Sequence, residues 1–217
     1  MVSLELHIFT NCTGIAPSTS AIRRTYKSFC DVFGKIIPNI WCDPKPNVRN
    51  YSKYRRNLLK NFPVVHETVS LSDGYIKAIK SSKADFLFIL EHDWQFQKKH
   101  INHTLKDILL AMKLFGIYHF RFNKRTNKIK GWDKILDPIK FKDLDMCMTN
   151  ILSNNPHIVN REKYLSFIDG GLIQVKPGSD GIEEIISKHP KTWGVIYGPP
   201  GHPATVKHLD GRKARKK

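Results

Sequence analysis

Two acidic residues and a histidine, Glu91, His92 and Asp93, directly follow a run of apolar residues at 86–90. Side chains two positions apart on an extended backbone point to the same side, so the carboxylates of Glu91 and Asp93 could converge on one cation. Carboxylate oxygens suit a hard ion such as Mg²⁺ or Mn²⁺, which can also bind phosphate oxygens. The pattern predicts a divalent-metal site here; the alternative is a solvated turn that closes a strand.

The apolar run before these residues has the composition of a strand that is buried on both faces of a parallel sheet. Ligands bind at the carboxyl edge of an open α/β sheet, because loops and helix N-termini line the crevice outside the strand ends. Glu91, His92 and Asp93 would lie at this edge. The apolar run therefore strengthens the metal-site interpretation.

Residues 1–95 alternate between strand patterns and helix patterns. We expect strands over residues 4–10, 35–42, 63–68 and 85–90, and helices over residues 19–33 and 70–84. Ser18 or Thr19 could cap the first helix, and Ser70 or Ser72 the second. An alternation of this kind indicates βαβ units and a parallel sheet.

The second half of the chain is less regular. Residues 100–115 have apolar side chains at helical spacing, and residues 116–125 alternate as a strand does. Residues 127–148 are rich in Lys and Asp, and we expect a loop with short regular pieces there. Residues 177–190 have Gly and Ser near their start and end at a proline, which predicts a helix.

The chain of 217 residues has 36 Lys and Arg against 19 Asp and Glu, a net charge of +17. This charge predicts an anionic partner, which could be nucleic acid, a membrane surface or a nucleotide diphosphate. The basic residues are spread along the chain, which favours a solvated surface over a binding stripe.

The four cysteines are far apart and form no CxxC pair, so the sequence supports neither a zinc knuckle nor a redox motif. The N-terminal residues lack the basic and apolar regions of a signal peptide. No segment approaches the roughly 18 apolar residues of a membrane span. We therefore expect a soluble, cytoplasmic protein without stable membrane insertion.

Two other classes of protein stay open at this point. A basic metal-dependent nucleic-acid-binding protein or nuclease would explain the net charge, and Glu91 and Asp93 could hold its metal. The sequence has no recognisable nucleic-acid-binding module, which makes nucleic acid the less favoured partner. A zinc hydrolase could use some of the ten histidines, but the HExxH spacing does not occur.

Several short motifs together resemble the GT-A glycosyltransferases. They are the E-x-D motif at 91–93 after an apolar strand, FTNCTG at 9–14, WCDP at 41–44 and LSDGY at 71–75. The resemblance implies an α/β fold with a GT-A-like single domain over residues 1–211, in which helices flank a mostly parallel central sheet. Residues 1–95 would form a Rossmann-like nucleotide-sugar-binding half and residues 96–211 the acceptor half. The basic tail, residues 212–217, is expected to be disordered.

The resemblance also implies roles for individual residues. Asp93 matches the principal metal ligand, Glu91 stands where the commoner D-x-D motif has Asp, and His208 resembles a late histidine that returns to the metal. The ion would be Mn²⁺ or Mg²⁺. The expected donor-binding residues are Thr10, Asn11, Cys12, Asp43, Asp73, Glu91, His92, Lys207 and Arg212, and the expected acceptor-binding residues are Trp94, Asn154 and His157.

The implied activity is that of a metal-dependent glycosyltransferase of the hexosyltransferase type. It would move a sugar from a nucleotide diphosphate sugar, with UDP favoured, to a hydroxyl group of a glycan or glycoprotein. An inverting enzyme needs a carboxylate base near that hydroxyl. Glu183 is the first choice for this base, Asp180 the second, and Glu184 lies beside them. The alternative is that these acids only favour the start of a helix through its dipole.

Overall fold

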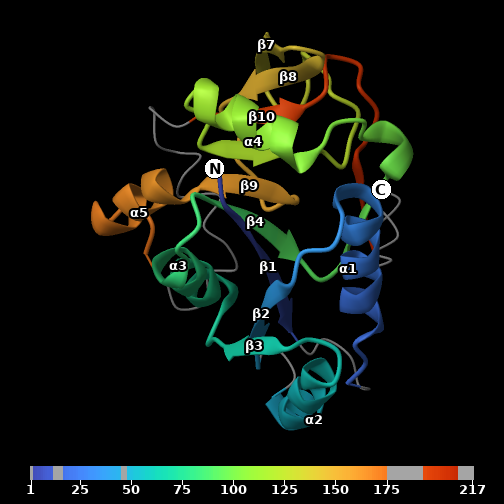
Figure 1. The fold of residues 1–217 in the computed structure, drawn as a ribbon, viewed down its shortest axis with the longest axis vertical. Coiled ribbons are helices and arrows are strands. Elements are labelled where there is room, and N and C mark those ends of the chain that lie inside the picture. The colour runs from blue at the N-terminus through green and yellow to red at the C-terminus, as the bar shows by residue number, and fades with distance from the viewer. Residues whose placement is uncertain (1, 12–16, 45–47, 175–192, 210–217) are drawn as a thin grey trace.

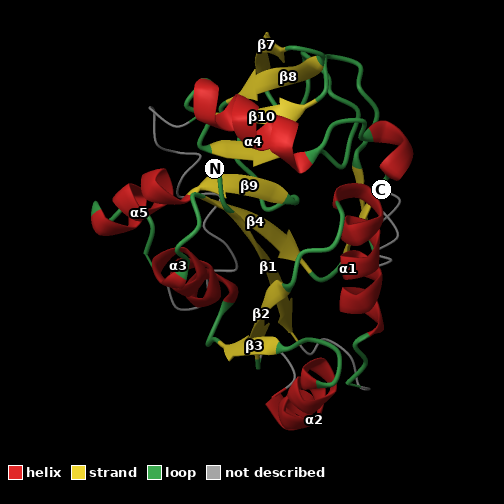
Figure 2. Cartoon of the chain, in the orientation of Figure 1, coloured by secondary structure: helices red, strands yellow, loops and turns green. Residues whose placement is uncertain are grey.

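The computed structural model describes residues 2–11, 17–44, 48–174 and 193–209. Its centre is one twisted nine-stranded sheet with helices on both faces (Figures 1 and 2). The helices are α1 (Ser20–Phe33), α2 (Val48–Leu59), α3 (Leu71–Ser81), α4 (Leu105–Leu114), α5 (Arg161–Asp169) and a short 3-10 helix, η1 (Lys98–His100). The strands of the large sheet are β1 (Leu4–Asn11), β2 (Pro38–Asp43), β3 (Val64–Glu67), β4 (Phe86–Glu91), β6 (His119–Arg121), β7 (Ile135–Phe141), β8 (Leu144–Thr149), β9 (His157–Asn160) and β10 (Gly194–Tyr197). A separate two-stranded sheet pairs β5 (Trp94–Phe96) with β11 (Val206–His208).

The large sheet has the strand order β3-β2-β1-β4-β9-β6-β10-β8-β7. β3, β2, β1 and β4 are parallel neighbours, as the first half of the sequence predicts. β9 lies antiparallel between β4 and β6, and β8 lies antiparallel between β10 and β7. Because β6 and β10 are parallel to each other, seven of the nine strands run in one direction. The predicted α/β fold with a mostly parallel central sheet is confirmed.

Strand alternation divides the apolar side chains between the two faces of the sheet. On β4, Phe86, Phe88 and Leu90 belong to a core with α1, α2 and α4, whereas Leu87 and Ile89 belong to a core with α3 and α5. Figure 1 shows α1 on one side of the sheet and α3 and α5 on the other. β4 is therefore buried on both faces, as its continuous apolar run predicts.

The predicted strands and helices of the first half are present, with bounds that differ by a few residues. The hydroxyl of Ser70 caps α3 by accepting a hydrogen bond from the Asp73 N–H group at 3.2 Å. Helix α2 is an element that the sequence analysis missed. Its signal was the helical spacing of Tyr51, Tyr54 and Leu58, two of which are buried in the core.

The second half corrects two expectations. The prediction of a loop over residues 127–148 holds for residues 127–134 and is wrong for the rest, because β7 and β8 form an antiparallel hairpin there. β7 is a largely exposed edge strand, a position that tolerates Pro138. α4 begins at Leu105, after a capping box between Thr104 and Asp107, and not at residue 100. The helix predicted over residues 177–190 lies outside the described residues.

Three histidines are buried in the large sheet, His7 on β1, His119 on β6 and His157 on β9. The rings of His119 and His157 stack with centroids 4.6 Å apart. In neutral His157, Nδ1–H donates to the Asn155 carbonyl and Nε2 accepts from the Tyr75 hydroxyl, each at 2.7 Å. Burial lowers the pKa of His7 and His157 to about 4 and holds the pKa of His119 well below its ordinary value.

We expect the protein to lose stability as the pH falls from about 6.5 to about 4. In this range the unfolded chain binds a proton at each of these histidines and the folded protein does not, so protonation favours unfolding. For His157 alone the difference in pKa corresponds to about 3 kcal/mol at the acid end. Denaturant unfolding at several pH values measures the effect.

The variant His157→Gln is the control for this assignment. It should be less stable than the parent protein at neutral pH, because glutamine lacks the ring that stacks on His119 and that bonds both Tyr75 and Asn155. It should also lose less stability on acidification. If its free energy of unfolding falls with pH as steeply as that of the parent, His157 is not a source of the acid sensitivity.

Candidate functional site

The chain turns sharply where the apolar strand β4 ends. β4 ends at Glu91. The next two residues, His92 and Asp93, form a turn, and β5 begins at Trp94. β5 pairs antiparallel with β11, and this pairing sets His208 opposite Trp94. His208 Nε2 lies 3.2 Å from Asp93 Oδ2, and the Leu209 N–H group donates to the Asp93 carbonyl at 2.6 Å. Two residues that are 115 positions apart in sequence thus meet at the carboxyl edge of β4.

Backbone hydrogen bonds from two other elements fix this turn. The His92 N–H group donates to the Phe9 carbonyl on β1 at 2.9 Å, and the Thr25 hydroxyl on α1 donates to the His92 carbonyl at 2.6 Å. The Ser28 hydroxyl, one turn further along α1, accepts from the Phe96 N–H group at 3.2 Å. The turn that carries Asp93 is therefore held through backbone groups, and these bonds do not use the Asp93 carboxylate. Burial lowers the pKa of His92 below its ordinary value.

The carboxylate of Asp93 has the properties of an incomplete cation site. Its Oδ2 faces His208, while its Oδ1 is buried and has no hydrogen-bond partner among the described residues. A buried carboxylate oxygen without a partner is unfavourable unless a cation or donor satisfies it. One carboxylate and one imidazole can bind Mn²⁺ or Mg²⁺ if phosphate oxygens and water supply the other ligands. The residues present therefore fit a metal that is shared with a phosphate-containing ligand.

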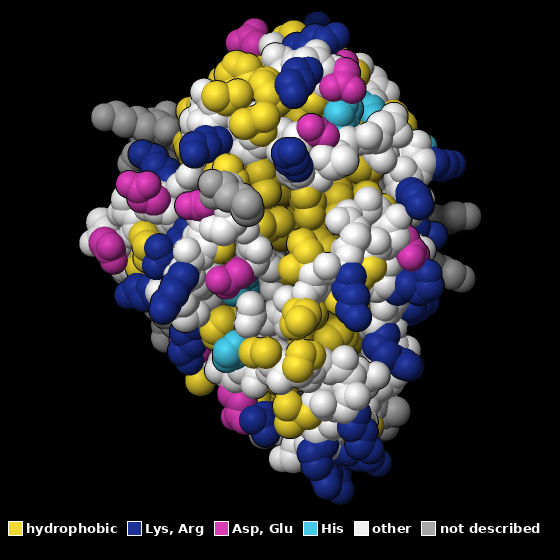
Figure 3. Space-filling model, in the orientation of Figure 1, with side chains coloured by type: hydrophobic (Ala, Val, Ile, Leu, Met, Phe, Trp, Pro, Cys, Tyr) yellow, Lys and Arg dark blue, Asp and Glu magenta, His cyan; other side chains and the backbone are white. Residues whose placement is uncertain are grey.

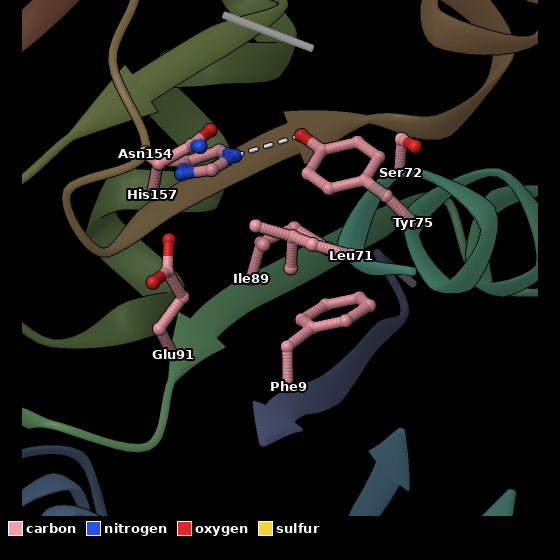
Figure 4. Close-up of a pocket in the computed structure, with 8 residues that line it drawn as sticks. All are labelled: Phe9, Leu71, Ser72, Tyr75, Ile89, Glu91, Asn154 and His157. Atoms are coloured by element: carbon pink, nitrogen blue, oxygen red, sulfur yellow. Dashed lines mark hydrogen bonds between the residues drawn. The ribbon is translucent and has the colours of Figure 1, made fainter. Parts of the chain in front are cut away.

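The third predicted metal ligand, Glu91, lies in a different place. Its side chain lines a narrow pocket on the α3 and α5 side of the sheet, together with Asn154 and His157 (Figure 4). Strand alternation explains this position, because Glu91 follows Leu87 and Ile89 on the same face of β4. The turn at residues 92 and 93 then directs Asp93 away from this pocket. Within the described part of the chain, no three His, Cys, Asp or Glu side chains are grouped closely enough to hold a metal.

Trp94 and a lysine complete the surroundings of His208. The ring of Trp94 is buried and meets the ring of His208 edge to face, with centroids 4.5 Å apart. The ammonium group of Lys124 lies 5.6 Å from the centre of the Trp94 ring. Lys124 thus places a positive charge against the Trp94 ring, whose edge-to-face neighbour is His208. The sequence does not single out this lysine, because it stands in a basic stretch without any other local signal.

The predicted donor residue Lys207 points away from the Asp93–His208 pair. Neighbouring residues of a strand point to opposite sides, and Lys207 is exposed on the side of β11 that it shares with Gln95. Its neighbours Val206 and His208 lie on the other side. Of these two lysines, Lys124 is the one that contacts the Trp94 ring beside His208.

The predicted donor residues on β1 and β2 do lie at the same edge of the sheet. Asn11 is the register partner of Asp43, at the carboxyl ends of two neighbouring parallel strands. Asn11 Oδ1 is buried, and no described residue is its hydrogen-bond partner. The Thr10 hydroxyl is buried and bonded to the Tyr54 hydroxyl on α2, so it holds two elements together.

The predicted donor residue Asp73 forms hydrogen bonds at the N-terminus of α3. Its carboxylate accepts hydrogen bonds from the Val69 N–H group at 3.0 Å and from the Lys77 ammonium at 2.8 Å. Burial by itself would raise the pKa of Asp73, but the bonds from Lys77 and Val69 outweigh it, and the pKa lies below its usual range. These partners make Asp73 a helix-capping residue in this structure.

The predicted acceptor residues separate into three positions. Trp94 packs beside His208, and Asn154 lines the pocket with Glu91. Figure 4 shows the carboxylate of Glu91 directed toward Asn154 and His157. His157 is 1% exposed, and both of its ring nitrogens already have partners, so no nitrogen is left for a substrate hydroxyl.

Five predicted site residues lie outside the described residues: Cys12, Asp180, Glu183, Glu184 and Arg212.

The sequence matches no protein-family model and no curated protein. Several solved structures are nevertheless similar in fold. The structure of S. aureus TarS 1-349 covers 94% of this chain at 12% identity with a TM-score of 0.54. The structure of the same protein in complex with UDP-GlcNAc covers 98% of this chain at 10% identity with a TM-score of 0.55. This chain spans 60% and 62% of those two TarS chains.

A second protein has a similar fold and a more similar length. The structure of CMP:2-keto-3-deoxy-manno-octonic acid synthetase complexed with CTP covers 93% of this chain, and this chain spans 93% of it, at 10% identity and a TM-score of 0.53. Identities as low as these establish a shared fold. Together with the sheet order and the flanking helices, they show that this chain has a GT-A-like fold.

Proposed function

We propose that this protein transfers a sugar from a nucleotide diphosphate sugar, with UDP-sugars favoured, to a hydroxyl group of a glycan or glycoprotein. The observation that carries the proposal is the meeting of Asp93 and His208 at the carboxyl edge of β4, where one buried Asp93 oxygen has no partner within the described part of the chain. The GT-A-like fold supports it, because TarS has a similar fold and its structure contains UDP-GlcNAc.

Asp93 and His208 would hold Mn²⁺ or Mg²⁺ in this proposal. When bound, the ion would neutralise charge on the diphosphate and so make it a better leaving group. Lys124 would add a second positive charge near the phosphates. The role of the protein is chiefly to hold these groups in place before the donor arrives, through the bonds from β1 and α1 to the turn.

The acceptor hydroxyl must lose a proton as it attacks the anomeric carbon. Glu183 and Asp180 stay the sequence-based choices for the base that takes this proton. In the described part of the site, Glu91 and Asn154 line the pocket on the other side of β4 and could bind acceptor hydroxyl groups. We assign them to acceptor binding, which moves Glu91 away from the metal role that its motif implies.

Nucleotidyl transfer is a second candidate activity, supported by the match in length with the synthetase that binds CTP. Such an enzyme would join a sugar to a nucleotide taken from a nucleoside triphosphate. Nucleic-acid binding is less favoured, because Figure 3 shows Lys and Arg side chains scattered around the face it displays, with apolar side chains gathered in the middle. Ligand binding distinguishes these activities.

A thermal-shift screen tests the proposal directly. Nucleotide diphosphates, their sugars and CTP are each added with and without Mn²⁺, and a ligand of the folded state raises the melting temperature. We expect a UDP-sugar with Mn²⁺ to give the largest rise. Asp93→Ala should abolish the Mn²⁺-dependent part of the rise with little loss of stability, whereas Asp137→Ala, an exposed carboxylate on β7, should keep it. Unaltered Mn²⁺-dependent binding in Asp93→Ala would refute the metal site.

Thr25→Val tests how the turn is positioned. Valine has nearly the shape of threonine but lacks the hydroxyl that donates a hydrogen bond to the His92 carbonyl. We therefore expect a loss of about 1–3 kcal/mol in the free energy of unfolding. We also expect weaker Mn²⁺-dependent donor binding, because the turn that carries Asp93 is less well fixed. Calorimetry with the donor measures the second effect. Equal donor affinity in Thr25→Val and the parent protein would show that the bond serves stability alone.

Glu183→Gln tests the proposed base. Glutamine keeps the shape of glutamate and removes the proton acceptor, so sugar transfer should fall by about 10²–10⁴-fold while donor affinity stays unchanged. Asp180→Asn is the matched comparison, and Glu184→Gln is the neighbouring control. Transfer at normal rates in all three variants would place the base elsewhere, or would indicate a reaction that retains configuration. The anomeric configuration of the product, read by NMR, decides between these two.

A further inference from the structure

A short surface loop between β6 and β7 is anchored at both of its ends by buried polar residues. Asn127 is 2% exposed; its side-chain amide donates to the carbonyls of Tyr197, Gly198 and Pro199 at 2.9, 3.1 and 3.2 Å. Asp133 is 5% exposed and pairs with the buried Arg121 at 2.6 Å. The loop between these two anchors is therefore held in one position by bonds that need no ligand.

The five residues between the anchors, 128–132, are all exposed. We call them the tip. Trp132 is 77% exposed and Ile129 is 62% exposed, and Leu136, just beyond the second anchor, is 50% exposed. Large apolar side chains in contact with water are unfavourable, and a group of them on a firmly held loop indicates a surface that binds something apolar.

The same segment is strongly basic. Between residues 124 and 140 one exposed residue is acidic, Asp137. The exposed basic residues in this stretch are Lys124, Arg125, Lys128, Lys130, Lys134 and Lys140. The remaining acid in this stretch, Asp133, is neutralised by Arg121 in the interior. A surface of this composition attracts an anionic partner and offers it aromatic and aliphatic side chains.

We propose that the tip docks the protein on an anionic lipid surface. Trp132 and Ile129 would enter the interface between headgroups and acyl chains, where tryptophan is favoured, and Lys128 and Lys130 would lie against the acidic headgroups. This mode of binding needs no membrane-spanning helix, and no described helix is long and apolar enough to be one. The proposal rests on the loop alone and does not depend on the proposed sugar transfer.

Lipid fits these side chains better than nucleic acid does. A nucleic-acid surface would use aromatic rings for stacking on bases, and aliphatic side chains contribute little to that contact. Here two of the three exposed apolar residues, Ile129 and Leu136, are aliphatic. Their value lies in burial away from water, which a bilayer provides.

Vesicle flotation with the full chain tests the proposal. We expect binding to vesicles of equal parts phosphatidylcholine and phosphatidylglycerol, weak or no binding to phosphatidylcholine alone, and a decline in binding as salt is added. Trp132→Ala should weaken binding about tenfold. The double variant Lys128→Gln/Lys130→Gln should weaken it about 25-fold, from about fivefold for each charge.

Matched substitutions elsewhere on the surface are the controls. Ile37→Ala removes a side chain that is 65% exposed, and Lys53→Gln/Lys60→Gln removes two exposed charges on and beside α2. Both should bind anionic vesicles nearly as well as the parent protein. The proposal is overturned if the protein does not bind, if the controls weaken binding as much as the tip variants do, or if Trp132→Ala reduces oligonucleotide binding and leaves vesicle binding intact. Donor binding in the thermal-shift screen is measured without lipid, so either proposal can fail alone.

Discussion

The double pairing of β4 is the constraint on which the rest of the structure depends. β4 is hydrogen-bonded to the parallel strand β1 on one side and to the antiparallel strand β9 on the other, so it joins the two halves of the large sheet. Helices cover both of its faces, which leaves its carboxyl end as the part that reaches the edge of the sheet. A strand so completely enclosed cannot place polar residues along its length. They are confined to its end, where Glu91, His92 and Asp93 stand.

Much of this arrangement could be predicted because the signals are local. The apolar run of β4, the helical spacing in α1 and α3, and the cap at Ser70 each depend on residues close together in sequence. Helix α2 was missed although its signal is local, whereas β9 and β7 owe their strand structure to pairing with distant residues. β9 is only four residues long and becomes a central strand through its neighbours β4 and β6, while β7 is an exposed edge strand whose Lys and Asp residues resemble those of a loop.

In the candidate site, too, some features could be predicted from the sequence and others could not. The proximity of Asp93 and His208 was expected from a resemblance, and the pairing of β5 with β11 explains it physically. The separation of Glu91 from Asp93 could not be predicted, because it results from a turn that α1 and β1 fix from outside. Lys124 has no local signal either. Its contact with the ring of Trp94 arises only because β6 leads it there.

The tip and the candidate metal pair are linked through one loop. Asn127, the first anchor of the tip, bonds to the carbonyls of residues 197–199, and its own N–H group donates to the His202 carbonyl at 3.0 Å. The same loop continues through Thr205, whose N–H group donates to the Asn123 carbonyl, into β11 and His208. Because the segment that carries His208 is held by the segment that carries the tip, the position of the proposed metal ligand depends on the β6–β7 loop as much as on β5. Loss of the Asn127 bonds would therefore loosen both the first anchor of the tip and the segment that leads to His208.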